Sequence, residues 1–323
     1  MTAQRQLKSI IRDRQARTGE SYTAARVHVM RDRATLLGLP VDGAARADAV
    51  VLRVNDRSAR VRILGEEQPI MFRSRDAGTV APGRVVTLVI ERRWSWRGHP
   101  CASGAMEHAR IDVGRLGLVP LPLTGGELWD GAEEDEAFAE PDPFAPRWRE
   151  LTAEPRRAYR FDPIAWGALA GQNPEDNLVC DAAELAEAGD PAGARELLME
   201  VLTADLRCLD AHAHLGNLEF KWSPARALVH YELGTRIGEL SLPGGATGFD
   251  GLLPWGVIHN RPYLRCLYGA GLCLWRLGRL PEAEAVFARV LELNPDDNQG
   301  ARFCWADVRE GRTWDEAVGA LRS

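Results

Sequence analysis

The stretch LRCLYGAGLCLWRLGRLPEAEAVFARVLELNP, residues 264–295, decides the fold of this chain. Its first half has small or apolar side chains at the i, i+3, i+4, i+7 spacing of one helix face: Leu267, Ala270, Gly271 and Leu274. Gly278 stands where a helix commonly ends, and Asn294-Pro295 stops the following segment. That segment is predicted to bury the side chains Ala283, Phe287 and Val290. We therefore expect two antiparallel helices that approach closely where their facing residues are small.

The same turn-and-alanine pattern recurs along the C-terminal half. Its reference alanines are Ala194, Ala227, Ala283 and Ala317, so the spacings are 33, 56 and 34 residues. The middle spacing equals one period of about 34 residues plus about 22 extra residues, which we assign to an insertion at 241–261. A helical hairpin cannot bury its apolar face alone, so about three such units are needed for a stable core.

These residues resemble the tetratricopeptide repeat, whose period is about 34 residues and whose units usually end in proline, as at Pro295. Weaker copies occupy 175–208 and 209–242, and a truncated copy at 296–323 would cap the stack. The resemblance implies an α-solenoid of about 3.5 helical hairpins over residues 166–323. The whole arrangement also resembles bacterial cytoplasmic tetratricopeptide proteins that carry a small N-terminal β-domain and have no assigned biochemical activity.

The resemblance further implies a non-enzymatic protein–protein interaction module, with a peptide or partner protein in the concave groove. The family's groove positions correspond here to Asn217, Phe220, Lys221, Arg265, Tyr268, Leu272, Trp275 and Arg276. This mixture of aromatic and cationic side chains suits an extended acidic or amphipathic partner segment.

The insertion is rich in glycine and proline but too apolar for a solvated linker. We expect a packed loop on the array, with Phe249, Trp255 and Asn260 as its candidate functional residues. It could bind a partner, or it could cover apolar surface as a structural plug.

The N-terminal half has a different pattern. Residues 1–46 predict a basic helical pair, which either lies on nucleic-acid phosphates or docks on the next domain. Residues 47–120 predict about five short strands separated by turns, which suit a small antiparallel barrel of the oligonucleotide-binding or SH3-like kind. We therefore expect an α+β multidomain protein.

An aromatic and basic cluster lies in the barrel region, at Arg92, Arg93, Trp94, Trp96 and Arg97. Tryptophans can stack on unpaired bases while arginines neutralise phosphates. Trp94 and Trp96 share one strand face, so they could equally form barrel core. The alternative function is therefore a nucleic-acid- or ribosome-associated factor that binds through the basic helices and the barrel. Residues 1–120 hold 21 basic and 12 acidic residues, which agrees with this alternative.

Residues 121–165 contain several prolines and an acidic run at Glu133–Glu136, a composition typical of a linker. Aromatic side chains such as Phe144 and Trp148 could attach it to a neighbouring domain.

The remaining features exclude several classes. The 323 residues contain no apolar run near the ~20 residues that span a bilayer, and no secretory signal is visible. Six scattered cysteines are typical of a cytoplasmic protein with reduced thiols. No dinucleotide, phosphate-loop or zinc-protease motif occurs, so we expect no enzyme activity, no cofactor and no membrane partner. Cys208, His212 and His214 come closest to a metal-ligand cluster, but His212 occupies a core position of the repeat.

Overall fold

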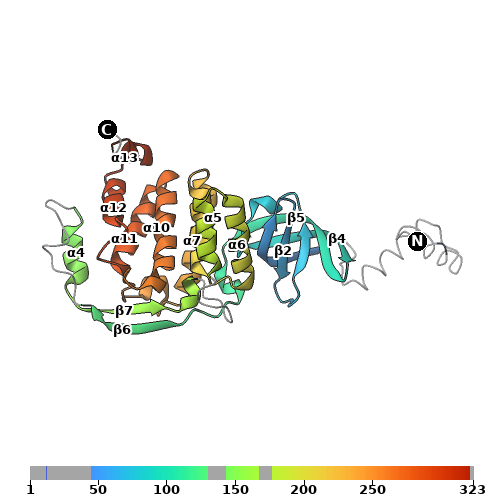
Figure 1. Ribbon diagram of the computed structural model, residues 1–323, viewed down its shortest axis with the longest axis horizontal. Coiled ribbons are helices and arrows are strands. Elements are labelled where there is room, and N and C mark those ends of the chain that lie inside the picture. The colour runs from blue at the N-terminus through green and yellow to red at the C-terminus, as the bar shows by residue number, and fades with distance from the viewer. Residues whose placement is uncertain (1–11, 13–44, 130–142, 167–176, 321–323) are drawn as a thin grey trace.

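The computed structural model describes residues 12, 45–129, 143–166 and 177–320. A β-barrel lies at one end of an elongated molecule, and a stack of helices extends from it (Figure 1). The predicted N-terminal helical pair lies outside the described residues, apart from Arg12 and the last two positions of its range, which begin the first strand.

Five strands close the barrel in the order β1-β2-β3-β5-β4. Their bounds are β1 (Ala45–Asn55), β2 (Ser58–Ile63), β3 (Ile70–Arg73), β4 (Val85–Trp96) and β5 (His99–Arg110). Neighbouring strands pair antiparallel, except β3 and β5, which run parallel. The prediction of a fully antiparallel barrel is therefore wrong for this pair. The reason is topological: after β3 the chain crosses through the 3-10 turn η1 (Ala77–Thr79) to the far side of β1, and the β4–β5 hairpin returns beside β3.

The barrel interior is filled by alternating side chains of these strands. Its fully buried members include Val51, Val61, Phe72, Leu88 and Ala102. This alternation is what a half-buried strand requires, since successive side chains point to opposite faces.

The helical array consists of three complete hairpins and a shorter fourth within the described residues. The hairpins are α5 (Leu178–Glu187) with α6 (Pro191–Ala204), α7 (Leu209–Phe220) with α8 (Pro224–Glu239), α10 (Arg261–Arg276) with α11 (Leu280–Leu293), and α12 (Ala301–Arg309) with α13 (Trp314–Ala320). The side chains of Asp190 and Ser223 accept hydrogen bonds at the N-termini of α6 and α8, and proline occupies the first position of each helix. The α+β class and the helical repeats predicted from the sequence are confirmed.

Small residues let neighbouring hairpins meet at backbone distance. The ring of Tyr231 on α8 lies between Gly216 on α7 and Gly269 on α10, and a Cβ at either glycine would be 2.5 Å from that ring. Within the third hairpin, a Cβ at Gly271 would be 2.7 Å from the ring of Phe287. Gly234 and Gly238 of α8 are as close to Cys266 and Tyr263 of α10, so several glycines allow the second and third hairpins to meet closely.

Residues 121–165, assigned to a linker above, form ordered structure in their described part. They contain β6 (Leu123–Trp129), α4 (Ala145–Thr152), β7 (Arg156–Phe161) and the 3-10 turn η3 (Pro163–Trp166). β6 and β7 pair antiparallel and run along the array from the barrel side to α4 at its far end (Figure 1). We call β6, α4 and β7 the strap. Composition did not reveal it because its few apolar side chains, including Phe144, Trp148 and Phe161, are buried against the array instead of forming a core of their own.

The strap is held by the insertion between α8 and α10, which contains α9 (Gly245–Gly248) and the 3-10 turn η4 (Ile258–Asn260). Leu252 accepts a backbone hydrogen bond from Tyr159 and donates one to Arg157. The fully buried amide of Asn260 accepts from the Phe161 backbone and donates to the carbonyls of Tyr159 and Pro254.

The barrel packs directly on the array. Val50 and Val85 are fully buried in the same apolar cluster as the helices, together with Leu116 at the end of the 3-10 turn η2 (Val113–Leu116). Gly83, with φ +82°, lies so close to Leu233 of α8 that a Cβ there would be 2.4 Å from its side chain. In the described part of the chain, no helix has both the length and the apolar character to cross a membrane.

His212 is part of the array core. Its ring is fully buried, and Nε2 lies 3.0 Å from the Leu206 carbonyl oxygen. Because that oxygen can only accept, Nε2 carries the proton of the neutral ring. Burial lowers the pKa of His212 to about 4.

We expect Gly269→Ala to destabilise the protein by about 1–3 kcal/mol, because the new Cβ overlaps the ring of Tyr231. Urea unfolding measures the difference. Gly319→Ala on α13 is the matched control, since open space surrounds that position and alanine favours a helix. A Gly269→Ala protein as stable as the control would show that the seam is not tightly packed.

We also expect the stability to fall as the pH is lowered from 7 towards 4. Below pH ~6.5 the unfolded chain binds a proton at His212 while the folded chain does not, which costs about 2 kcal/mol between pH 7 and pH 5. His212→Gln should reduce this pH dependence, whereas His108→Gln, a substitution of an exposed histidine, should leave it unchanged. Unfolding curves at several pH values provide the test, and identical slopes for all three proteins would contradict it.

Candidate functional site

The groove face is the side of the array formed by the first helices of the hairpins, α5, α7, α10 and α12. The structure places the eight predicted groove residues on α7, on α10 and at Lys221 directly after α7. They form three groups with different surroundings. Phe220, Trp275 and Arg276 lie at the C-terminal ends of these helices, and Arg265 lies near the N-terminal end of α10. The remaining residues, which include Lys221 directly after α7, form a third group that we call central.

The C-terminal group is already occupied by the chain itself. The guanidinium of Arg276 stacks on the rings of Phe220 and Trp314, at 4.8 and 5.6 Å, and donates a hydrogen bond to the Phe220 carbonyl. Trp275 is 4% exposed, and its Nε1 donates to the Arg312 carbonyl at 2.8 Å. Phe220, Trp275 and Arg276 therefore hold the start of α13 across the helix ends.

The N-terminal group centres on a buried ion pair. Arg265 lies 2.9 Å from Asp210, which is 2% exposed and also lies 3.9 Å from the ring of His214. Trp255 from the insertion lies under the guanidinium groups of Arg261 and Arg265, at 5.3 and 5.8 Å. The insertion thus extends this end of the groove face with one half-buried aromatic ring.

The central group offers the accessible surface. Asn217 and Lys221 are exposed, while Tyr268 and Leu272 are half-buried between them and α12. Asn217 Oδ1 accepts a hydrogen bond from the Tyr231 hydroxyl, so its amide nitrogen remains the group that points outward. Trp222, 78% exposed, lies beside this group with its ring 4.7 Å from Lys221 Nζ. Trp222 was not among the predicted site residues, and its place in the turn between two repeat helices is the sequence signal that could have indicated its exposure.

Phe249 and Asn260, the other two candidate residues of the insertion, are buried in contacts within the chain. Phe249 is buried and packs edge-on against Tyr159 at 5.2 Å, and Asn260 holds the strap as described above. This favours the structural alternative for Phe249 and Asn260, and leaves Trp255 as the accessible aromatic residue.

The tryptophans of the barrel cluster lie on its outer face. Inward-facing residues of β4 are Val86, Leu88 and Ile90, and continuing that alternation would place Trp94 and Trp96 inside. A β-bulge between Ile90 and Arg92 shifts the register by one residue and reverses the faces. Trp96 is consequently 60% exposed, and the core alternative fails for it.

The register brings further side chains to this outer face. Trp94 pairs with Cys101, Cys101 with Met71, and Met71 with Arg60, so the four side chains form one row across the sheet. Arg73 and Arg92 hold their guanidinium groups 5.6 and 5.7 Å from the Trp94 ring. We call this surface the barrel stripe; it comprises Arg60, Met71, Arg73, Arg92, Trp94, Trp96 and Arg97.

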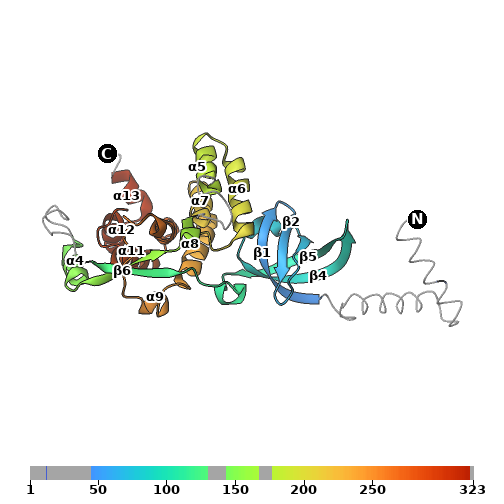
Figure 2. The same cartoon turned by 60° about the horizontal axis from the view of Figure 1, so that its bottom comes forward.

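Arg93 does not belong to the barrel stripe. It pairs with Ala102, which pairs with Phe72, and both of these are fully buried on the inner side. The paired ends of β4 and β5 that carry the stripe project from the barrel on the side away from the array (Figure 2).

In the described segments, groups of three or more His, Cys, Asp or Glu side chains able to hold a metal ion do not occur. Burial raises the pKa of the Cys208 thiol to about 12, so it is neither a thiolate ligand nor a nucleophile at neutral pH.

The comparisons with known proteins agree with the helical half. Residues 264–297 match the family described as Tetratricopeptide repeat, and this segment covers α10, from Leu264, together with α11. No curated protein and no solved structure matches the chain. The chain therefore contains a tetratricopeptide repeat in its third hairpin, and such repeats are typical of protein–protein interaction modules.

Proposed function

We propose that this protein is a non-enzymatic scaffold that binds an extended segment of a partner protein on the central part of the groove face. The observation that carries the proposal is the contrast between the three groups of groove residues. The two outer groups are held by partners within the chain, whereas exposed Asn217 and Lys221 and half-buried Leu272 offer polar, cationic and apolar side chains to a partner.

The charge of this surface indicates an acidic or amphipathic partner segment. Lys221 has no carboxylate partner among the described residues, and its Nζ lies 4.7 Å from the Trp222 ring. Opposite charge on a partner adds specificity and association rate, and half-buried Leu272 and Tyr268 supply an apolar contact. All six cysteines are unpaired, which supports a reducing compartment such as the cytoplasm.

Substitutions on one helix test this proposal. A peptide selected from a library of acidic and amphipathic sequences should bind the full chain, and Leu272→Glu should weaken its affinity by about tenfold or more. Leu277→Glu is the matched control, because it adds the same charge at an exposed position at the end of the same helix. Fluorescence anisotropy measures both, and equal affinities of the two variants would reject the groove face as the binding surface.

The barrel stripe favours a second candidate function, the binding of single-stranded nucleic acid. A five-stranded Greek-key barrel is the architecture of oligonucleotide-binding folds, which use the β2–β3 face and the β1–β2 and β4–β5 loops. The stripe lies on that face and extends to the β4–β5 turn, where Arg97 stacks on Trp96 at 4.7 Å. Residues 45–119 hold 13 arginines and eight acidic residues, so the barrel can also neutralise phosphates.

An oligopyrimidine binding assay tests the second candidate. Trp96→Ala should weaken binding by roughly tenfold, since one stacked base contributes about 1–3 kcal/mol. Trp222→Ala, which removes a still more exposed tryptophan from the array, should have no effect. Arg73→Ala should lower both the affinity and its salt dependence, whereas Arg93→Ala should change neither. Absence of binding at low salt would eliminate this function.

A further inference from the structure

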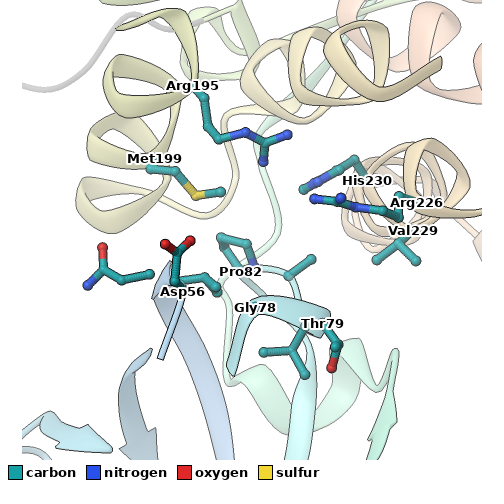
Figure 3. A pocket seen from close by; sticks show the side chains of 13 residues that line it. Asp56, Gly78, Thr79, Pro82, Arg195, Met199, Arg226, Val229 and His230 are labelled. Carbon is teal, nitrogen blue, oxygen red and sulfur yellow. The ribbon is translucent and has the colours of Figure 1, made fainter. Parts of the chain in front are cut away.

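A cavity of about 220 Å³ lies at the joint between the barrel and the array. The barrel contributes the turn between β1 and β2 and the segment around η1, and the array contributes α6 and α8. Figure 3 shows Arg195, Arg226 and His230 pointing from the helices into the space above Pro82 and Asp56.

The array wall carries an excess positive charge. Arg195 and Arg226 both contact the same oxygen of Glu219, with Arg226 at 3.1 Å. One carboxylate balances one guanidinium, so the trio keeps one net positive charge. Burial and the nearby Arg226 lower the pKa of Arg195, so the surroundings disfavour its charge. Each guanidinium also has N–H groups beyond those that Glu219 can accept from.

His230 adds a third polar group that the protein leaves unused. Its side chain is on the cavity wall, the residue is 5% exposed, and Nδ1 has no hydrogen-bond partner among the described residues. Burial and the neighbouring His212, Arg195 and Arg226 lower its pKa to about 3, so the ring is neutral. Buried polar atoms are nearly always paired, so an unpaired one on a cavity wall indicates a missing partner.

The barrel wall of the cavity carries hydrogen-bond acceptors. Asp56 and Asn55 supply oxygen acceptors, and the Thr79 hydroxyl donates to the Asp76 carbonyl at 2.7 Å, which leaves its oxygen available to accept. A molecule that fills the cavity therefore meets donors on the array side and acceptors on the barrel side.

We propose that this cavity is a binding site for a small phosphate monoester, with the phosphate on Arg195, Arg226 and His230 and a hydroxyl group of the ligand on Asp56. Two guanidinium groups, with the neutral imidazole in its Nδ1–H tautomer as a third donor, match the three terminal oxygens of a phosphate better than the two oxygens of a carboxylate. The cavity is large enough for a compact ligand, and its few polar side chains come from the array on one wall and from the barrel on the other. This site is distinct from the groove face and from the barrel stripe.

Because its walls belong to different units, the ligand bridges the barrel and the array. Binding should slow amide hydrogen exchange both around residues 77–82 and in α8. Protection of the helix alone would mean that the barrel wall takes no part, and would overturn the bridging arrangement.

Calorimetric titration of the full chain with inorganic phosphate at constant ionic strength tests the site. We expect one saturable site and a loss of affinity of about tenfold or more in Arg226→Ala. Arg236→Ala is the matched control: it lies on the same helix, with 60% side-chain exposure against 64%, and likewise has a glutamate partner. Absence of saturable binding, or equal affinity in the two variants, would overturn the proposal.

A second variant tests the barrel wall. Asp56→Asn should bind inorganic phosphate about two- to fivefold tighter, because it removes a negative charge from the cavity. The same variant should lose the preference of the wild-type protein for glycerol 3-phosphate over inorganic phosphate, since the carboxylate that accepts from the hydroxyl group is gone. An unchanged preference would show that Asp56 does not contact the ligand, and would overturn its assigned role.

Discussion

The array depends on close packing at glycines between the second and third hairpins, and the ring of Tyr231 held between Gly216 and Gly269 is the contact that spans α7, α8 and α10. A side chain at either glycine would overlap the ring, so the two hairpins meet at a distance that only glycine permits. The Tyr231 hydroxyl donates to Asn217 at 2.6 Å, which connects this buried seam to the accessible surface. The position of α7 relative to α10, and with it the shape of the groove face, follows from that contact.

This close contact also explains the strap. Since α8 and α10 pack against each other, the residues between them must leave the stack, and they present Leu252 and Asn260 to β7. Arg156 of β7 then donates to the carbonyls of Asp250, Gly251 and Glu292, so one guanidinium joins the strap, the insertion and α11. At the far end, Phe144 packs edge-on against Trp305 at 5.6 Å and covers the last hairpin. The insertion is therefore a docking element for β7 as well as a part of the groove rim.

Local sequence patterns were enough to predict the helical half. The strap and the barrel face that carries the tryptophans could not be predicted in this way, because they depend on contacts between distant residues and on a bulge. The repeat could be predicted because spacing, glycine stops and small residues all act within about 34 residues. The strap could not, because the hydrogen bond from Phe161 to Asn260 joins positions 99 residues apart. The side of the barrel on which Trp94 and Trp96 lie depends on one bulge after Ile90, and strand alternation gives no warning of such a shift. The groove residues Phe220, Trp275 and Arg276 lie at the ends of α7 and α10, and their contact with Trp314 of the capping repeat joins positions too far apart for the repeat pattern to predict.

The joint between barrel and array determines which surfaces remain available. Val50 of β1 and Val85 at the start of β4 point out of the barrel into the array core, and Gly83 lies against Leu233. This side of the barrel is therefore covered by the array. β2, β3 and the projecting ends of β4 and β5 stay clear of the helices (Figure 2). Both the groove face and the barrel stripe are thus open at the same time, and the cavity beside Arg195 lies at the contact that fixes their relative orientation. A molecule bound there would contact the joint and none of the residues of the groove face or the barrel stripe.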